Sequence, residues 1–113
     1  MKCLIVRQPW VDKILDGSKL WEMRSRSTTV RGRIGIIEAG TGTIVGEVTL
    51  TDVAEPIRDM QDAEATTCFH RVENISLLKK WRYPWVMAEP VRYEKPVPYQ
   101  HPKGAVVWVN VEK

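Results

Sequence analysis

The spacing of apolar residues changes abruptly at Gly17, and this change limits the folds open to the chain. Before Gly17, four apolar residues between positions 10 and 15 recur at helical spacing behind Pro9. Proline suits the first turn of a helix because its missing N–H would have no partner there, and glycine commonly ends a helix. From Lys19 onward the period is two, as in a β-strand. The sequence therefore predicts a helix over residues 9–16 that Gly17 ends, followed directly by a strand.

Most of the remaining chain has the pattern of strands joined by short turns. Five segments are expected to be extended: residues 3–7, 32–37, 44–51, 85–88 and 105–111. Residues 44–51 alternate most clearly, as in a strand with one buried face. The preceding Gly40-Thr41-Gly42 supplies a turn that tolerates positive φ.

Helices are predicted in the third quarter of the chain. Residues 52–71 are polar and predict a helix after Pro56, and Asn74 is a candidate N-cap for a helix over residues 75–81. The later prolines exclude a long central strand or helix between them, because each lacks the backbone N–H: Pro90, Pro96, Pro98 and Pro102. This order favours one α+β domain over residues 1–113, mostly β: a small, mostly antiparallel barrel with flanking helices.

Composition excludes several classes of protein. The chain is 43% hydrophobic and 27% charged, which is ordinary for a globular domain. No apolar run approaches the ~20 residues that span a bilayer, and the opening stretch is too short for a secretory signal, so we expect a cytoplasmic protein without membrane contact. Cys3 and Cys68 are expected to be reduced. Because Cys68 and His70 give too few zinc ligands and no nucleotide-binding glycine motif is present, we expect no metal and no cofactor.

The segment after Gly17 gathers three charge chemistries. Lys19, Glu22 and Arg24 lie within six residues beside a glycine turn, which suits a small site for a polar or anionic ligand. A desolvated lysine can act as a base near neutral pH, or it can stay charged and bind a phosphate. A carboxylate can orient that lysine or accept a base-edge amine, and an arginine can hold a phosphate with two hydrogen bonds. Lys19, Glu22 and Arg24 are therefore the candidate catalytic residues.

Basic residues continue beyond this segment. Four arginines fall within ten residues that contain no acid, which points to a polyanion, with RNA as the first candidate. A tryptophan on the preceding helix could stack on a base. The candidate nucleic-acid-binding residues are therefore Trp10, Arg24, Arg26, Arg31 and Arg33.

The charged residues also have structural alternatives. Glu22 and Arg24 are two apart, so on a strand they share a face and could simply pair with each other. Strict alternation would place Lys19 on the opposite face from Glu22, although a bend after the glycine turn would remove this objection. The arginines between residues 26 and 33 could keep an exposed hairpin edge soluble instead of binding RNA.

The aromatic residues and histidines have structural alternatives as well. Trp10 falls on the apolar face of its helix, where core packing competes with base stacking. Trp81, Trp85 and Trp108 are expected in the core. His101, in a proline-bounded loop, could assist proton transfer, although a lone loop histidine is more often a bystander.

These motifs together resemble the ASC-1 homology (ASCH) domain. The family's Gly-x-Lys-x-x-Glu-x-Arg string is matched by Gly17, Lys19, Glu22 and Arg24. The resemblance also covers three further segments: Ile5 to Trp10, Ile44 to Val48 and Gly104 to Val109. It implies a fold similar to the PUA barrel, with a cleft beside the first helix and the Lys-Glu-Arg segment.

The resemblance implies several functions. Members of the family are proposed to bind RNA, some small bacterial members hydrolyse N4-acetylcytidine, and others have been described as ribonucleases. In the hydrolase branch a threonine lies three residues after the lysine and could serve as acyl nucleophile, whereas this chain has Glu22 there. We therefore predict first a module that binds RNA or a nucleotide-like ligand. The alternatives are an amidohydrolase acting on a modified nucleoside, a metal-independent ribonuclease, and a protein-interaction adaptor without chemistry.

Overall fold

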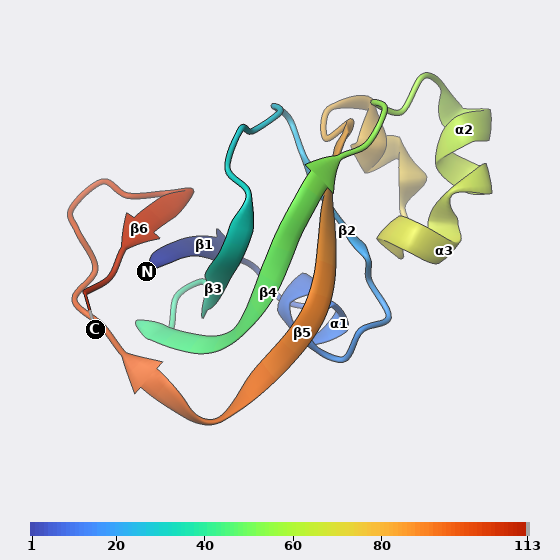
Figure 1. Cartoon of the computed structure of the whole chain (residues 1–113). Helices are drawn as coiled ribbons and strands as arrows, with labels where there is room; N and C mark the ends of the chain where they lie inside the picture. Colours follow the sequence, from blue (N-terminus) through green and yellow to red (C-terminus); the bar gives the residue numbers. More distant parts are fainter. Residues whose placement is uncertain (113) are drawn as a thin grey trace.

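The computed structural model describes residues 1–112 as a curled six-stranded sheet with short helices (Figure 1). The strands are β1 (Lys2–Val6), β2 (Trp21–Arg24), β3 (Gly32–Glu38), β4 (Thr43–Val53), β5 (Tyr83–Pro98) and β6 (Trp108–Asn110). The helices are α1 (Trp10–Leu15), α2 (Met60–Ala65), α3 (Thr67–His70) and the 3₁₀ helix η1 (Ile75–Lys79). The predicted α+β, mostly β class is confirmed. Among the described residues, no helix is long and apolar enough to cross a membrane.

The strands are ordered β2-β5-β4-β3-β1-β6, and they curl into a half-barrel. Only the β1–β3 pairing is parallel; the other four pairings among residues 1–112 are antiparallel. In Figure 1, α2 and α3 lie together at one end of the sheet, whereas β1 and β6 lie at the other end beside both termini. Helix α1 therefore lies on the connection between β1 and β2, two strands that are far apart in the strand order.

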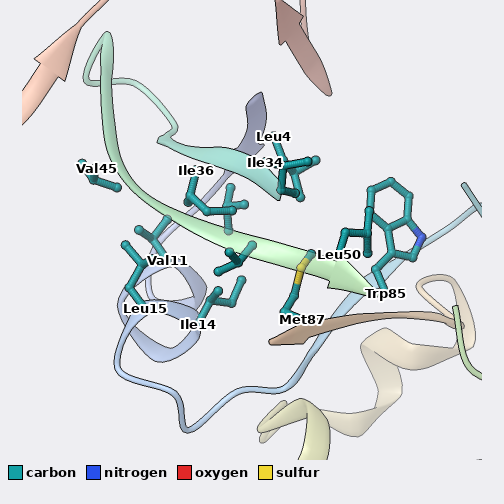
Figure 2. Close-up of a cluster of buried hydrophobic side chains, with 12 residues drawn as sticks. Leu4, Val11, Ile14, Leu15, Ile34, Ile36, Val45, Leu50, Trp85 and Met87 are labelled. Atoms are coloured by element: carbon teal, nitrogen blue, oxygen red, sulfur yellow. The ribbon is translucent and has the colours of Figure 1, made fainter. Parts of the chain in front are cut away.

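Helix α1 packs its apolar face on the sheet. Val11, Ile14 and Leu15 are buried and point toward the side chains of β3, β4 and β5 in Figure 2. Leu15 comes so close to Gly46 that a Cβ there would lie 2.8 Å from Leu15 and 2.5 Å from the Val91 carbonyl oxygen. Burying each large aliphatic side chain contributes about 1.5–3 kcal/mol. This contact fixes α1, and with it the loop that carries Lys19.

Strand β5 contradicts the expectation that the prolines after residue 89 exclude a long strand. It runs to Pro98, but the register with β4 shifts between Glu47 and Thr49, opposite Glu89 and Pro90. Glu89 adopts a left-handed φ of 52° at this bulge. Beyond Met87, whose N–H still donates to the Leu20 carbonyl oxygen, the strand pairs with β4 alone. A proline at a bulge or on an edge strand removes no ladder hydrogen bond, so the long strand tolerates its prolines.

The other predicted elements agree with the structure to different degrees. The helix over residues 9–16 is confirmed as α1, with Pro9 at its N-cap and Gly17 just beyond its end at a φ of 86°. The last strand is shorter than expected, since only Trp108–Asn110 is extended. Asn74 precedes a 3₁₀ helix and makes no capping bond to it; its side chain accepts a hydrogen bond from Ser76 instead. Asn74 therefore occupies the predicted N-cap position, but without the capping hydrogen bond.

Candidate functional site

A pocket of about 320 Å³ opens between β1, β2, α1 and the segment around η1. Its lining combines charged, aromatic and aliphatic side chains: Ile5, Arg7, Trp10, Lys19, Glu22, Met23, Arg24, Val72, Leu77, Trp81 and Val106. Lys19, Glu22 and Arg24, which the sequence analysis singled out, line this one pocket together with Trp10. Within residues 1–112, no three histidine, cysteine, aspartate or glutamate side chains gather in a way that could hold a metal ion.

Lys19 lies almost fully buried at the base of this arrangement. Its backbone N–H donates to the Lys13 carbonyl oxygen at 2.9 Å, which ties the loop to α1. Its Nζ donates a hydrogen bond to the His70 carbonyl oxygen and lies 4.7 Å from the ring centroid of Trp10. Burial lowers the pKa of Lys19 to about 8, although the nearby Glu22 carboxylate opposes the shift. The ammonium is therefore still the main form at neutral pH, but its proton is unusually easy to remove.

His70 holds the carbonyl that Lys19 contacts. Its Nδ1 accepts a hydrogen bond from the Val72 N–H at 2.9 Å, so Nε2 carries the proton and donates to the Ala63 carbonyl oxygen at 2.7 Å. The ring is completely buried, and burial lowers the pKa of His70. The neutral ring joins α2 to the segment that reaches the pocket wall at Val72. Sequence reasoning gave His70 no role, because nothing in the sequence indicated that residue 70 lies against residue 19.

Glu22 and Arg24 form the ion pair that was the structural alternative. Both Nε and Nη2 of Arg24 contact the same carboxylate oxygen, Oε2 of Glu22, at 3.1 and 2.9 Å. Nη2 also donates to the Ile5 carbonyl oxygen at 2.7 Å, and the guanidinium lies 5.6 Å from the Trp85 ring. Within residues 1–112, Oε1 of Glu22 makes no hydrogen bond. Oε2 thus holds the carboxylate in place, and Oε1 is available to accept a hydrogen bond from a ligand.

The alternation of β2 does not separate Lys19 from Glu22. The strand begins at Trp21, so Lys19 precedes it and its side chain does not follow the pleat. Both side chains line the same pocket. The objection raised by strict alternation is therefore wrong, and the bend after Gly17 is the reason.

Two tryptophans border the pocket. Trp10 packs against the core, as the structural alternative predicts, and it also lines the pocket; its stacking on a base stays a prediction. Trp81 was expected in the core, but 37% of its surface is exposed and it lines the pocket. Trp85 is buried as expected and stacks on the half-buried Trp108 at 5.8 Å between ring centroids. Trp21 stacks on Phe69 at 4.7 Å.

Arg26, Arg31 and Arg33 are exposed, and none of them is among the pocket-lining residues. Arg33 contacts the Glu47 carboxylate at 3.1 Å and donates to the Glu89 carbonyl oxygen at 2.7 Å. Arg31 donates to two nearby carbonyl oxygens and lies 3.8 Å from an Asp52 carboxylate oxygen. Their contact with RNA stays a prediction.

One residue named in the sequence analysis lies outside the pocket lining, and one pocket-lining arginine was not predicted. His101 bonds with Tyr99 and with the Ala105 carbonyl oxygen, and it is not among the pocket-lining residues. Arg7 lines the pocket and was missed, because a lone arginine after a short strand carries no sequence signal of its own.

Comparisons with known proteins agree on one family. The sequence model of the ASCH domain matches residues 4–97. The crystal structure of a point variant of an ASCH protein from Zymomonas mobilis matches with a TM-score of 0.73 at 11% identity, covering 99% of this chain and 88% of that one. A structure of ASCH from the same organism matches with a TM-score of 0.69 at 11% identity, covering 86% of this chain and 72% of that one. No curated protein matches significantly. At such identity the structural likeness concerns the fold.

Proposed function

This chain belongs to the ASCH domain family, and we propose that its pocket binds a nucleobase, either of RNA or of a free nucleotide or modified nucleoside. Family membership supports a nucleic-acid-related domain. The proposal adds the place of binding and the groups that make the contacts.

One observation carries this proposal: a hydrogen-bond donor and an acceptor line the same pocket as two tryptophans. Lys19 Nζ keeps N–H groups beyond the one that the His70 carbonyl accepts, and Glu22 keeps Oε1. Every nucleobase carries donors and acceptors side by side on its edge, and an aromatic side chain that stacks on a base contributes about 1–3 kcal/mol. The pocket of about 320 Å³ lies at the lower end of the range for small-molecule sites, which suits a single base.

A second candidate function is hydrolysis of an amide on a modified nucleoside. It is favoured by the pKa of Lys19, about 8, which leaves about a tenth of the side chain as a free amine at neutral pH. That amine could take a proton from a water that attacks the acyl carbon and return the proton to the nitrogen as the C–N bond breaks, which gives acetate and the free amine of the base. No serine, threonine or cysteine is among the described residues that line the pocket, so water rather than a hydroxyl side chain would be the nucleophile.

The test is direct binding with simultaneous detection of chemical change. Wild type, Lys19→Met and the control Lys95→Met, which alters an exposed lysine of β5, are incubated with four ribonucleosides, a panel of modified nucleosides including N4-acetylcytidine, and RNA pentamers. We expect calorimetry to detect binding by wild type and Lys95→Met, and a loss of at least about tenfold in Lys19→Met, since a charge-assisted hydrogen bond contributes about 1.5–3 kcal/mol.

Mass spectrometry of the same mixtures separates the alternatives. Unchanged ligands support a binding module, release of acetate that Lys19→Met abolishes supports the hydrolase, and cleaved pentamers support a ribonuclease. Fragments that persist in Lys19→Met indicate a contaminating nuclease. If no ligand of the panel binds or reacts, the nucleobase pocket is refuted, and an adaptor role gains support.

A further inference from the structure

Three cations line the pocket, and two of them are already engaged by the protein. Arg24 is held by Glu22 and by a backbone carbonyl, and Lys19 is held by the His70 carbonyl under the Trp10 ring. Within residues 1–112, the guanidinium of Arg7 makes no hydrogen bond and no ion pair. Arg7 is therefore the cation of the pocket that is available to a ligand.

The position of Arg7 is fixed although its side chain is exposed. It directly follows β1, which ends at Val6, and its carbonyl oxygen accepts a hydrogen bond from the Val11 N–H of α1 at 3.2 Å. The backbone is thus tied to both β1 and α1, while Arg7 as a whole is exposed and lines the pocket. Such an arrangement holds the charge near the pocket and lets the side chain adjust to a ligand.

On the premise of the proposed nucleobase pocket, we propose that Arg7 binds a phosphate group of the ligand, so that the pocket selects a phosphorylated nucleotide over the bare nucleoside. A guanidinium matches a phosphate with two parallel hydrogen bonds, and such charge-assisted bonds are stronger than neutral ones. Arg24 could make the same contact only by leaving Glu22 and the Ile5 carbonyl. The phosphate belongs either to a mononucleotide or to a residue within an RNA strand.

The experiment measures how much a phosphate tightens binding. Each of the four ribonucleosides is titrated beside its 5′- and 3′-monophosphate against wild type, Arg7→Gln and the control Arg58→Gln, which removes an arginine that is 82% exposed and not among the pocket-lining residues. In wild type and Arg58→Gln, we expect the phosphate to lower Kd about tenfold. In Arg7→Gln, we expect this gain to disappear while the Kd of the nucleoside stays within about twofold.

An RNA pentamer distinguishes the two sources of the phosphate. If a strand residue occupies the pocket, Arg7→Gln weakens pentamer binding and reduces the slope of log K against log salt by about 0.7, as one counterion fewer is released. If the gain is confined to one monophosphate and the pentamer does not bind, the ligand is a free nucleotide. Both results support the phosphate contact.

The outcomes that overturn the inference differ from those that overturn the proposed function. If nucleosides bind but the phosphate brings no gain, or if the gain survives in Arg7→Gln, Arg7 is not the phosphate contact, and the nucleobase pocket stands. If no nucleoside, nucleotide or pentamer binds, both proposals are refuted. Because Arg7 is exposed and its side chain makes no hydrogen bond or ion pair among the described residues, Arg7→Gln is expected to unfold at the same denaturant concentration as wild type.

Discussion

Lys19 carries its charge in a place where burial opposes it. Only 2% of its surface is exposed, and the loss of hydration lowers its pKa to about 8. The Glu22 carboxylate opposes this shift, whereas the positive charges of Lys13 and Arg24 lower the pKa further. Burial of this charge therefore lowers the stability of the folded state. It also leaves, at the wall of a pocket, a lysine whose proton is easily removed.

This cost predicts how the stability of the protein depends on pH. The unfolded chain binds the Lys19 proton up to the ordinary pKa of 10.5, whereas the folded chain binds it only up to about 8. Between these values the unfolded state binds more protons, so the free energy of unfolding rises with pH. We expect the difference between wild type and Lys19→Met in urea denaturation to shift by about 3 kcal/mol in favour of wild type between pH 7.5 and pH 10.5. If the difference in unfolding free energy between wild type and Lys19→Met stays constant over this range, folding does not lower the pKa of Lys19.

Glu22 predicts a second effect at the residue scale. Its negative charge raises the pKa of Lys19 against the effect of burial. Glu22→Gln removes that charge, so we expect the pKa of Lys19 to fall below 8. The NMR chemical shift of the Lys19 ε-carbon across a pH titration measures this pKa. Glu55→Gln, which alters an exposed carboxylate, serves as control and is expected to leave the titration unchanged. An unchanged pKa in Glu22→Gln would mean that solvent screens the two groups from each other.

The sequence predicted the candidate site only where its residues are neighbours in the chain. Lys19, Glu22 and Arg24 lie within six residues, so a turn followed by a strand was enough to bring them together. Arg7 and Trp81 come from distant segments, and the topology that brings those segments to the same pocket depends on strand pairings that no local pattern encodes. Side chains that reach the site by long-range pairing could therefore not be identified in advance.

At the scale of elements, helix α1 could be predicted from local signals, whereas the length of strand β5 could not be predicted without its partner strand. Helix α1 was predicted from its spacing, Pro9 and Gly17, all of which act within the helix itself. Strand β5 was missed because its prolines were judged without its partner. Pro90 lies where the register with β4 shifts, and the strand beyond Met87 pairs with β4 alone. Whether a proline breaks a strand depends on where its missing N–H points, which the partner strand decides.

The His70 ring bonds both α2 and the segment beyond α3. Because this ring is buried in its neutral form, we predict that the protein loses stability in acid. Its pKa lies below the ordinary 6.5 because the ring is buried. As the pH falls through about 6.5, the unfolded state takes up the proton first, so the free energy of unfolding decreases. Protonation would also convert Nδ1 from an acceptor into a donor facing the Val72 N–H.

We expect His70→Gln to lose about 1–3 kcal/mol at neutral pH, because glutamine cannot keep both buried hydrogen bonds. Below about pH 6.5 its stability should fall less steeply than that of wild type, which urea denaturation at several pH values measures. His101→Gln is the matched control, since His101 is exposed, and its acid profile should follow wild type. Equal acid sensitivity in His70→Gln and wild type would assign the effect to carboxylates instead.

At the scale of the whole molecule, the count of 17 lysines and arginines overstates how many cations are available to a polyanion. Arg31, Arg33, Arg58 and Arg92 each lie within 4.0 Å of a carboxylate. Arg33 also anchors the β4–β5 bulge through the Glu89 carbonyl oxygen. A phosphate would compete with these carboxylates, whereas Arg26 makes no side-chain hydrogen bond or ion pair among the described residues.

This distribution predicts that replacing Arg26 changes RNA binding but not stability, whereas replacing Arg33 changes stability and has little effect on RNA binding. Arg26→Gln should weaken binding of an RNA pentamer and reduce its salt dependence by about 0.7 in the slope of log K against log salt, with no change in the free energy of unfolding. Arg33→Gln should lower the free energy of unfolding by about 1 kcal/mol, because the Glu89 carbonyl and the Glu47 carboxylate lose a partner, and change RNA affinity little. If Arg33→Gln reduces the salt slope as much as Arg26→Gln, the phosphate displaces Glu47. The RNA path then follows the β3 face of the sheet as well as the pocket rim, because an arginine that releases a counterion must touch the strand of RNA.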